Sequence, residues 1–267
     1  MNKLLASLMF FTRLPWWRLR QVPKEAFVHV VDWWPLVGWL TGGVMAVVFV
    51  ATSLLGFSDA VAALLAIVSR ILLTGALHED GLADFCDGFG GGTSRARTLF
   101  IMKDSHIGTF GVLGLFLYLG LFWASLSAFS SLPFLPHDGC LTAPLTAGCL
   151  ILLFDVTAKC AASLITGQLP YARSEEEAKN RVVYVGRSLR GWLLHALRCA
   201  LVLALPIALC VYSGVGKVVV LLPVPFVVEF LLMWWMRRRL DGYTGDCCGA
   251  LFLLCELSLY LSLPLIP

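Results

Sequence analysis

Long stretches without a charged side chain constrain this chain more than any other feature. Residues 33–58 form an uncharged run of 26 residues, and residues 107–136 contain no Lys, Arg, Asp or Glu. About 18 consecutive apolar residues are enough to indicate a membrane-spanning helix. Only 14% of the residues are charged, whereas soluble globular domains have about 25%. The sequence therefore predicts an integral membrane protein.

The apolar runs predict an all-α, polytopic fold with about seven transmembrane helices. We place the spans at 33–57, 59–77, 107–131, 140–165, 191–213, 217–236 and 249–266. The N-terminal segment is apolar but is interrupted by Arg13 and Pro15, and no small-residue cleavage site follows it. It predicts a helix lying in the membrane interface rather than a cleaved signal. Because no internal repeat or linker is visible, we expect a single domain over 1–267.

Basic residues predict the orientation of the spans. Sixteen Lys and Arg fall on the N-terminal segment and on alternate loops, whereas Lys217 alone falls on the opposite side. The sixteen are Lys3, Arg13, Arg18, Arg20, Lys24, Arg95, Arg97, Lys103, Arg173, Lys179, Arg181, Arg187, Arg190, Arg237, Arg238 and Arg239. Cytoplasmic loops carry such an excess. We expect a protein of the inner (cytoplasmic) membrane, with the N-terminus and the polar motifs facing the cytoplasm.

An acidic cluster follows the second predicted span, in the stretch GALHEDGLADFCDGFGGG. Asp80, Asp84 and Asp87 are spaced four and three residues apart, which places them on one face of a helix. Like charges on one face repel unless a cation lies among them, and carboxylates suit a hard ion such as Mg²⁺. Glu79 is a further metal-site candidate and His78 a candidate catalytic residue, although both lie off that face and could instead surround the ion without binding it directly. The alternative is a solvated acidic loop.

A glycine cluster and basic residues come next. Gly90 and Gly91 belong to a run that allows backbone N–H groups to approach an anion, and Arg95 and Arg97 follow it. This order predicts a phosphate or diphosphate site, although a glycine run alone is usually a turn. Lys103 is a further phosphate-binding candidate.

Three other aspartates complete the set of polar candidates. Asp104 precedes the third predicted span and is a candidate ligand or general base. Asp241 and Asp246 lie in the stretch RRRLDGYTGDCCGA, before the last span. Asp246 would close the site from a distant helix, and Asp241 would contact substrate. For both, a plain helix N-cap is the alternative.

Charged residues inside the apolar spans have a different expected role. Asp155 and Lys159 are four residues apart and can pair along one helix. For the remaining ones, structural pairing and a polar pocket stay open; these are Arg70, Arg198, Glu229 and Glu256. The nine cysteines include no CxxC pair, so we interpret them as small buried apolar residues rather than as a zinc site or a disulfide framework.

Several blocks together resemble the cobalamin synthase family, adenosylcobinamide-GDP ribazoletransferase. They are GALHEDGLADFCDG, IMKDSHIGTFG, LPYAR and YTGDCCGA, with FFTRLP and PLVG near the N-terminus. They occur in order across nearly the whole chain, and the H-x-DGLAD-x-x-DG block is the most specific of them. His106 departs from the family pattern, in which an arginine is more usual.

The resemblance implies a magnesium-dependent membrane transferase of substituted phosphate groups. Its substrates would be adenosylcobinamide-GDP and α-ribazole or α-ribazole 5′-phosphate, and its products GMP and adenosylcobalamin or its 5′-phosphate. Mg²⁺ at the acidic cluster would polarise the phosphate, and Asp104 or Asp246 would accept the proton of the attacking hydroxyl. The lipid bilayer is the other expected partner. No nucleic-acid partner is expected, and a homo-oligomer is compatible with the sequence.

Two other functions stay open on the residues alone. A CDP-alcohol phosphatidyltransferase also uses spaced aspartates around a divalent ion, but the AR of its D-x-x-DG-x-x-AR pattern is missing here. An ion-coupled transporter would use Asp155, Glu229 and Glu256. Transporters place such groups at the bilayer midplane, on broken helices within repeats, and the sequence shows no repeat.

Overall fold

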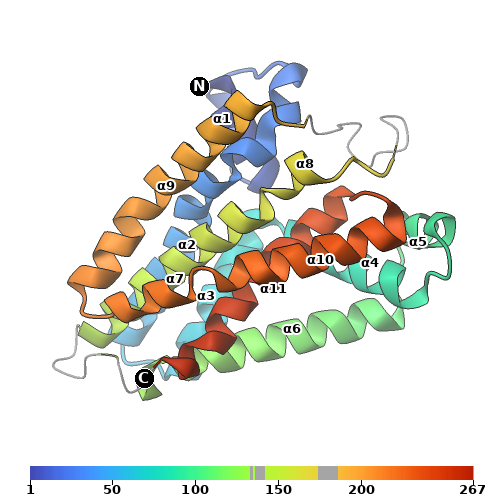
Figure 1. The fold of residues 1–267 in the computed structure, drawn as a ribbon. Coiled ribbons are helices and arrows are strands. Elements are labelled where there is room, and N and C mark those ends of the chain that lie inside the picture. The colour runs from blue at the N-terminus through green and yellow to red at the C-terminus, as the bar shows by residue number, and fades with distance from the viewer. Residues whose placement is uncertain (133–134, 136–141, 174–185, 267) are drawn as a thin grey trace.

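The structure of the chain, a computed structural model, is a bundle of helices (Figure 1). It describes every residue except 133–134, 136–141, 174–185 and 267. The α-helices are α1 (Asn2–Phe11), α2 (Val30–Leu54), α3 (Asp59–Thr74), α4 (Leu77–Gly91), α5 (Arg95–Ile101), α6 (Thr109–Ser127), α7 (Thr142–Ala162), α8 (Ile165–Gln168), α9 (Leu189–Tyr212), α10 (Val224–Leu240) and α11 (Gly245–Ser262). Short 3₁₀ turns are η1 (Trp16–Arg18), η2 (Lys24–His29), η3 (Phe129–Ser131), η4 (Gly216–Leu221) and η5 (Leu263–Leu265).

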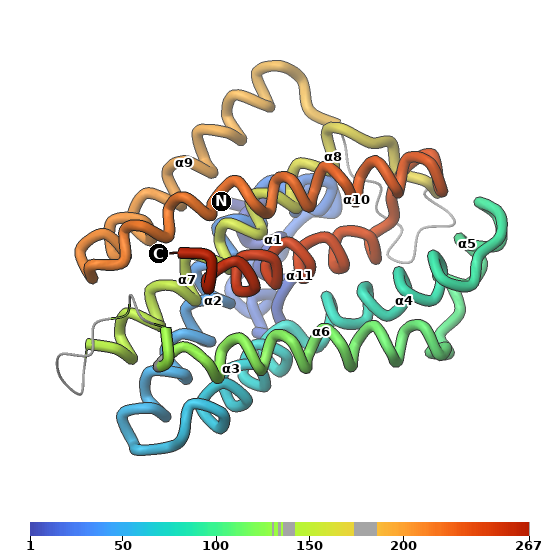
Figure 2. The backbone as a smooth tube through the Cα atoms, turned by 60° about the horizontal axis from the view of Figure 1, so that its bottom comes forward, coloured from blue at the N-terminus to red at the C-terminus, as the bar shows by residue number. Residues whose placement is uncertain are grey.

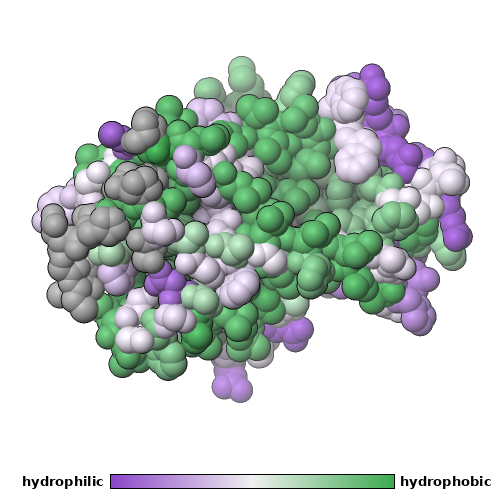
Figure 3. Space-filling model, turned by 90° about the horizontal axis from the view of Figure 1, so that it is seen from below, coloured by the Kyte–Doolittle hydropathy of each residue, from purple (hydrophilic) through white to green (hydrophobic). Residues whose placement is uncertain are grey.

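The prediction of a polytopic all-α membrane protein is confirmed. Six helical segments of the described chain are long and apolar enough to cross a membrane, and a seventh crossing results if α3 and α4 are counted as one bent span. Figure 3 shows the corresponding surface, which is largely hydrophobic across the middle and hydrophilic towards the margins. The beginning of the predicted span 140–165 lies outside the described residues.

The second span differs from its prediction, because it is broken. Helix α3 ends at Thr74; its C-cap Gly75 is in the left-handed region at φ 67°, and Ala76 follows at φ 57°. A left-handed alanine costs roughly 1–2 kcal/mol, so surrounding contacts must hold this turn. The Arg13 backbone N–H donates to the Leu73 carbonyl at 2.8 Å, and the Arg13 side chain covers Gly75. The chain turns by 90° between α3 and α4.

The acidic stretch is helical, as the spacing of Asp80, Asp84 and Asp87 predicted, and is not the solvated loop of the alternative interpretation. Helix α4 lies beside α6 (Figure 2) and crosses the beginning of α11. The N-terminal segment also forms a helix, α1, which packs against α2 through a hydrogen bond from Ser7 Oγ to the Val30 carbonyl at 2.8 Å.

A neutral cluster of buried charges holds the centre of the bundle together. The predicted pair of Asp155 and Lys159 is confirmed, with Lys159 Nζ donating to Asp155 Oδ1. Arg70 Nη1 lies 2.6 Å from both oxygens of Glu256 and 3.8 Å from Asp155. Thr41 donates to Asp155 at 3.0 Å. All four charged side chains are at most 1% exposed. Together with Thr41, their contacts join α2, α3, α7 and α11 at the centre of the bundle.

The cysteines are as expected where the structure describes them. All eight described cysteines are free, and five of them are buried. Cys140 lies outside the described residues.

Candidate functional site

The crossing of α4 and α11 brings the two acidic motifs together. A Cβ atom on Gly81 would lie 2.9 Å from the Asp246 carbonyl oxygen, and one on Gly249 would lie 2.9 Å from the His78 carbonyl oxygen. Glycine at both positions therefore permits backbone contact between the helices. Asp80 and Asp246 are 166 positions apart in the sequence. The helix crossing brings both of them to the lining of one cavity.

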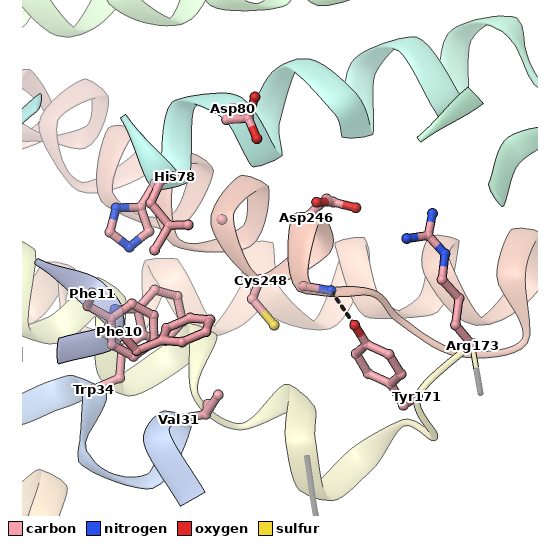
Figure 4. A pocket seen from close by; sticks show the side chains of 13 residues that line it. Phe10, Phe11, Val31, Trp34, His78, Asp80, Tyr171, Arg173, Asp246 and Cys248 are labelled. Atoms are coloured by element: carbon pink, nitrogen blue, oxygen red, sulfur yellow. Dashed lines mark hydrogen bonds between the residues drawn. The ribbon is translucent and has the colours of Figure 1, made fainter. Parts of the chain in front are cut away.

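The cavity beside this crossing has a volume of about 160 Å³ (Figure 4). Its lining comes from α1, α2, α4, α11 and the segment after α8. The lining residues are Phe10, Phe11, Val31, Trp34, Leu77, His78, Asp80, Tyr171, Arg173, Gly245, Asp246, Cys248 and Gly249. Figure 4 shows aromatic rings at one end, Arg173 at the other, and the two aspartates between them.

Asp246 has a definite position at the start of α11. Thr244 is the N-cap of the helix, so the alternative that Asp246 is itself the N-cap does not hold. Its Oδ2 accepts a hydrogen bond from Thr244 Oγ1 at 3.3 Å, and its side chain is 9% exposed. A carboxylate in the first turn is stabilised by the helix dipole. Asp80, in contrast, is exposed to solvent.

Tyr171 and Arg173 were not among the predicted site residues. A short parallel bridge pairs Tyr171 with Tyr243, and the Tyr171 hydroxyl accepts a hydrogen bond from the Gly245 N–H at 3.3 Å. Burial raises the pKa of Tyr171 to about 12, so this phenol stays neutral at physiological pH. The Arg173 guanidinium donates to the Leu99 carbonyl at 2.9 Å. The block LPYAR was the sequence signal that pointed to both.

The remaining members of the acidic cluster face different partners. Asp87 accepts hydrogen bonds from the N–H groups of Gly108 at 2.7 Å and Gly111 at 2.8 Å, at the beginning of α6. Both of its oxygens therefore stabilise a helix N-terminus, as an N-cap does. Asp84, one turn after Asp80, is partly exposed. Glu79 is buried and does not line the cavity; it acts electrostatically on Arg70.

Most of the glycine run is part of a helix and not a turn. Helix α4 includes Gly90 and Gly91, and Gly92 is its C-cap. Arg95 donates to the Leu240 carbonyl at 2.7 Å and to the Ala172 carbonyl at 2.8 Å. Its guanidinium thereby ties α5 to the end of α10 and to the segment that carries Arg173. Arg97 is exposed, with its guanidinium 5.3 Å from the Phe100 ring centroid.

Three further predicted residues lie outside the cavity. Lys103 and Asp104 are exposed between α5 and α6, and Asp104 accepts hydrogen bonds from the His106 N–H at 3.0 Å and from His106 Nδ1 at 2.7 Å. These bonds hold the pKa of Asp104 below its usual value, which makes it a weaker base. Asp241 is exposed and ends α10 at φ 50°.

The carboxylates suit a magnesium ion that is shared with a substrate. Within the described part of the chain, no three His, Cys, Asp or Glu side chains are arranged to hold a metal by themselves. Magnesium usually keeps several waters and takes one or two carboxylates together with substrate phosphates. Asp80 lines the cavity and could supply one such carboxylate; Asp84 lies one turn further along α4 and is not among the lining residues.

Comparison with known proteins gives a consistent result. The model of the family described as cobalamin-5-phosphate synthase matches residues 3–264. A protein of Shewanella amazonensis named adenosylcobinamide-GDP ribazoletransferase is 36% identical over 262 residues, which cover 98% of this chain and 94% of that protein. A protein of the same name from Vibrio parahaemolyticus is 33% identical over 263 residues, which cover 98% of this chain and 92% of that protein. Another, from Leptothrix cholodnii, is 36% identical over 270 residues, which cover 96% of this chain and 92% of that protein. No solved structure matches.

Proposed function

Because the chain belongs to the cobalamin-5-phosphate synthase family, we propose that it transfers the cobinamide phosphate of adenosylcobinamide-GDP to α-ribazole or its 5′-phosphate. The products are GMP and adenosylcobalamin or its 5′-phosphate, which places the enzyme in the assembly of the cobalamin nucleotide loop. Its class is that of a transferase, as the shared name of its relatives supports.

The observation that carries the proposal is the cavity in which Asp80, Asp246 and Arg173 meet. In the reaction, a ribose hydroxyl oxygen attacks the cobinamide-bound phosphorus and forms a phosphoester. The phosphoanhydride bond breaks, and GMP leaves with the bonding electron pair. Such a displacement needs charge neutralisation and a proton acceptor in a fixed place.

Asp246 is our choice for the residue that accepts the proton of the attacking hydroxyl. It lines the cavity in the first turn of α11, and its carboxylate accepts a hydrogen bond from Thr244. Asp104, the other candidate, is exposed, bonded to His106 and outside the cavity. Arg173 is positioned to bind phosphate oxygens through the remaining N–H donors of its guanidinium.

Asp80 and Asp84 are the residues that would hold Mg²⁺. When bound, the ion supplies neutralisation of phosphate charge and polarisation of the phosphorus. We assign Asp87 to the support of α6 and Glu79 to the balance of charge near Arg70. In this assignment neither of these two residues coordinates the ion.

We also propose that the site faces the cytoplasm, in the inner membrane. The basic residues at the ends of α5 and α10 support this orientation. In a background without native cysteines, a membrane-impermeant maleimide added outside should label Lys217→Cys and should leave Thr93→Cys unlabelled until the membrane is opened; both positions are exposed. The reverse labelling would contradict the orientation.

The function is tested by reconstitution. The purified chain in liposomes, given adenosylcobinamide-GDP, α-ribazole and Mg²⁺, should release GMP and form adenosylcobalamin in equal amounts. Removing Mg²⁺ with EDTA should stop both GMP release and adenosylcobalamin formation. GMP release without a corrinoid product would indicate hydrolysis and would contradict the transfer.

A further inference from the structure

The 169–173 segment ends in Arg173 and lies against the turn between α10 and α11. The Ala172 N–H donates to the Tyr243 carbonyl at 2.8 Å, and the Tyr243 N–H donates to the Pro170 carbonyl at 3.0 Å. These two bonds fix the backbone of the segment as far as Ala172. The next residue is Arg173, whose side chain lines the cavity (Figure 4).

The Arg95 side chain reaches the same segment from the beginning of α5. Its Nη2 donates to the Ala172 carbonyl at 2.8 Å, and its Nε donates to the Leu240 carbonyl at 2.7 Å. Leu240 is the last residue of α10, where carbonyls without a partner in the helix and the negative end of the helix dipole favour a cation. One guanidinium therefore joins the carbonyl next to Arg173 to a helix end.

The Arg173 side chain is held by the other end of α5. Its Nη2 donates to the Leu99 carbonyl at 2.9 Å, in the last turn of that helix. Arg173 is only 7% exposed. Helix α5 thus contacts the segment twice, through the donor Arg95 at its first residue and the acceptor Leu99 near its last. A side chain that is already held in place loses less entropy when it binds a ligand, so these contacts favour binding by Arg173.

We propose that Arg95 is a positioning residue, which holds Arg173 in place to bind the diphosphate of adenosylcobinamide-GDP; this inference rests on the function proposed above. Arg95 is exposed and is not a lining residue of the cavity. It acts through the Ala172 carbonyl, and Arg173 is the residue that touches the phosphate. Because α-ribazole carries no phosphate, the binding of that nucleoside does not depend on either arginine.

A double-mutant cycle tests whether Arg95 acts through Arg173. The measured quantity is the Kd of adenosylcobinamide-GDP, by equilibrium dialysis of the purified chain with Mg²⁺. Arg173→Gln should weaken binding by about 10-fold or more, because it loses charge-assisted hydrogen bonds to phosphate. Arg95→Gln should weaken binding by about 5-fold, and the double variant should bind like Arg173→Gln, because nothing is left for Arg95 to position. Losses that multiply in the double variant would indicate two independent phosphate ligands and would overturn the proposal.

Arg238→Gln is the matched control for the loss of charge. Arg238 is exposed near the same end of α10, with its guanidinium 4.1 Å from the Trp234 ring centroid, and its replacement should leave the Kd unchanged. A loss equal to that of Arg95→Gln would indicate a long-range effect of charge and would overturn the proposal. Arg95→Lys keeps the charge but can reach only one of the two carbonyls. It should give an intermediate loss, and it takes the place of Arg95→Gln in the cycle if that variant fails to fold.

The Kd of α-ribazole separates positioning from a general distortion of the cavity. It should keep its wild-type value in Arg95→Gln, and a weaker affinity for this nucleoside would contradict the proposal. The cycle does not depend on turnover. If the Kd values follow the cycle but wild type forms no corrinoid product, the proposed function fails and the role of Arg95 stands. If wild type turns over and Arg95→Gln binds adenosylcobinamide-GDP like wild type, the proposed function stands and the role of Arg95 fails.

Discussion

Asp80→Asn and Asp246→Asn should each lower turnover by about 100-fold or more, the scale expected when a displacement loses a metal ligand or a base. Asparagine keeps the shape of each side chain and removes its charge. Both variants should insert and purify like wild type, because Asp80 is exposed and the N-cap of α11 is Thr244. The measurement is GMP release per folded molecule at saturating substrates.

Asp104→Asn is the matched control for this prediction. Asp104 lies outside the cavity and bonds only to its neighbour His106 among the contacts described above, so its loss should leave turnover within about threefold of wild type. Asp87→Asn keeps a side-chain oxygen that can accept hydrogen bonds from the N-terminus of α6. Its turnover should therefore decrease much less than that of Asp80→Asn. A loss in Asp104→Asn as large as that in Asp246→Asn would contradict the choice of base.

The largest effect on stability should come from breaking the buried charge cluster. Arg70→Met leaves the Glu256 carboxylate, which is fully buried, without the guanidinium that it contacts at 2.6 Å. Removing one partner of a buried pair costs about 3–5 kcal/mol. We therefore expect Arg70→Met to have a markedly lower melting temperature in detergent than wild type. Glu256→Gln should also have a lower melting temperature.

The double variant Arg70→Met/Glu256→Gln supplies the control. It removes both charges and leaves the pair of Asp155 and Lys159 intact, so it should recover much of the stability that Arg70→Met loses. If Arg70→Met unfolds at the wild-type temperature, or if the double variant is as unstable as the sum of the two single variants, the cluster does not stabilise the bundle in this way.

Hydropathy located the spans because a bilayer imposes length and apolarity on every crossing helix. It could not locate the break after α3, because residues 75–77 continue the apolar run. That break depends on a tertiary contact, the Arg13 side chain covering Gly75. The helical spacing of the acidic residues did predict the helix that follows this break.

Helical spacing predicted that the acidic residues share one face of a helix. It could not predict which other helices that face contacts. Along α4 the neighbour changes from α11 near Asp80 to α6 near Asp87, so identical side chains have different partners. Arg95 illustrates the same limit, since it bonds to backbone carbonyls at the end of α10 and after α8. The pairing of Asp155 with Lys159 was predictable because both partners lie on one helix.

The central claim is that Asp80 on α4 holds the ion while Asp246 on α11 serves as the base. It is tested most directly by the affinity for Mn²⁺, a paramagnetic substitute for Mg²⁺, measured by electron paramagnetic resonance in the presence of adenosylcobinamide-GDP. Asp80→Asn should weaken Mn²⁺ binding by about 10-fold or more, whereas Asp246→Asn should bind Mn²⁺ like wild type although it no longer turns over. Unchanged Mn²⁺ affinity in Asp80→Asn would contradict the account.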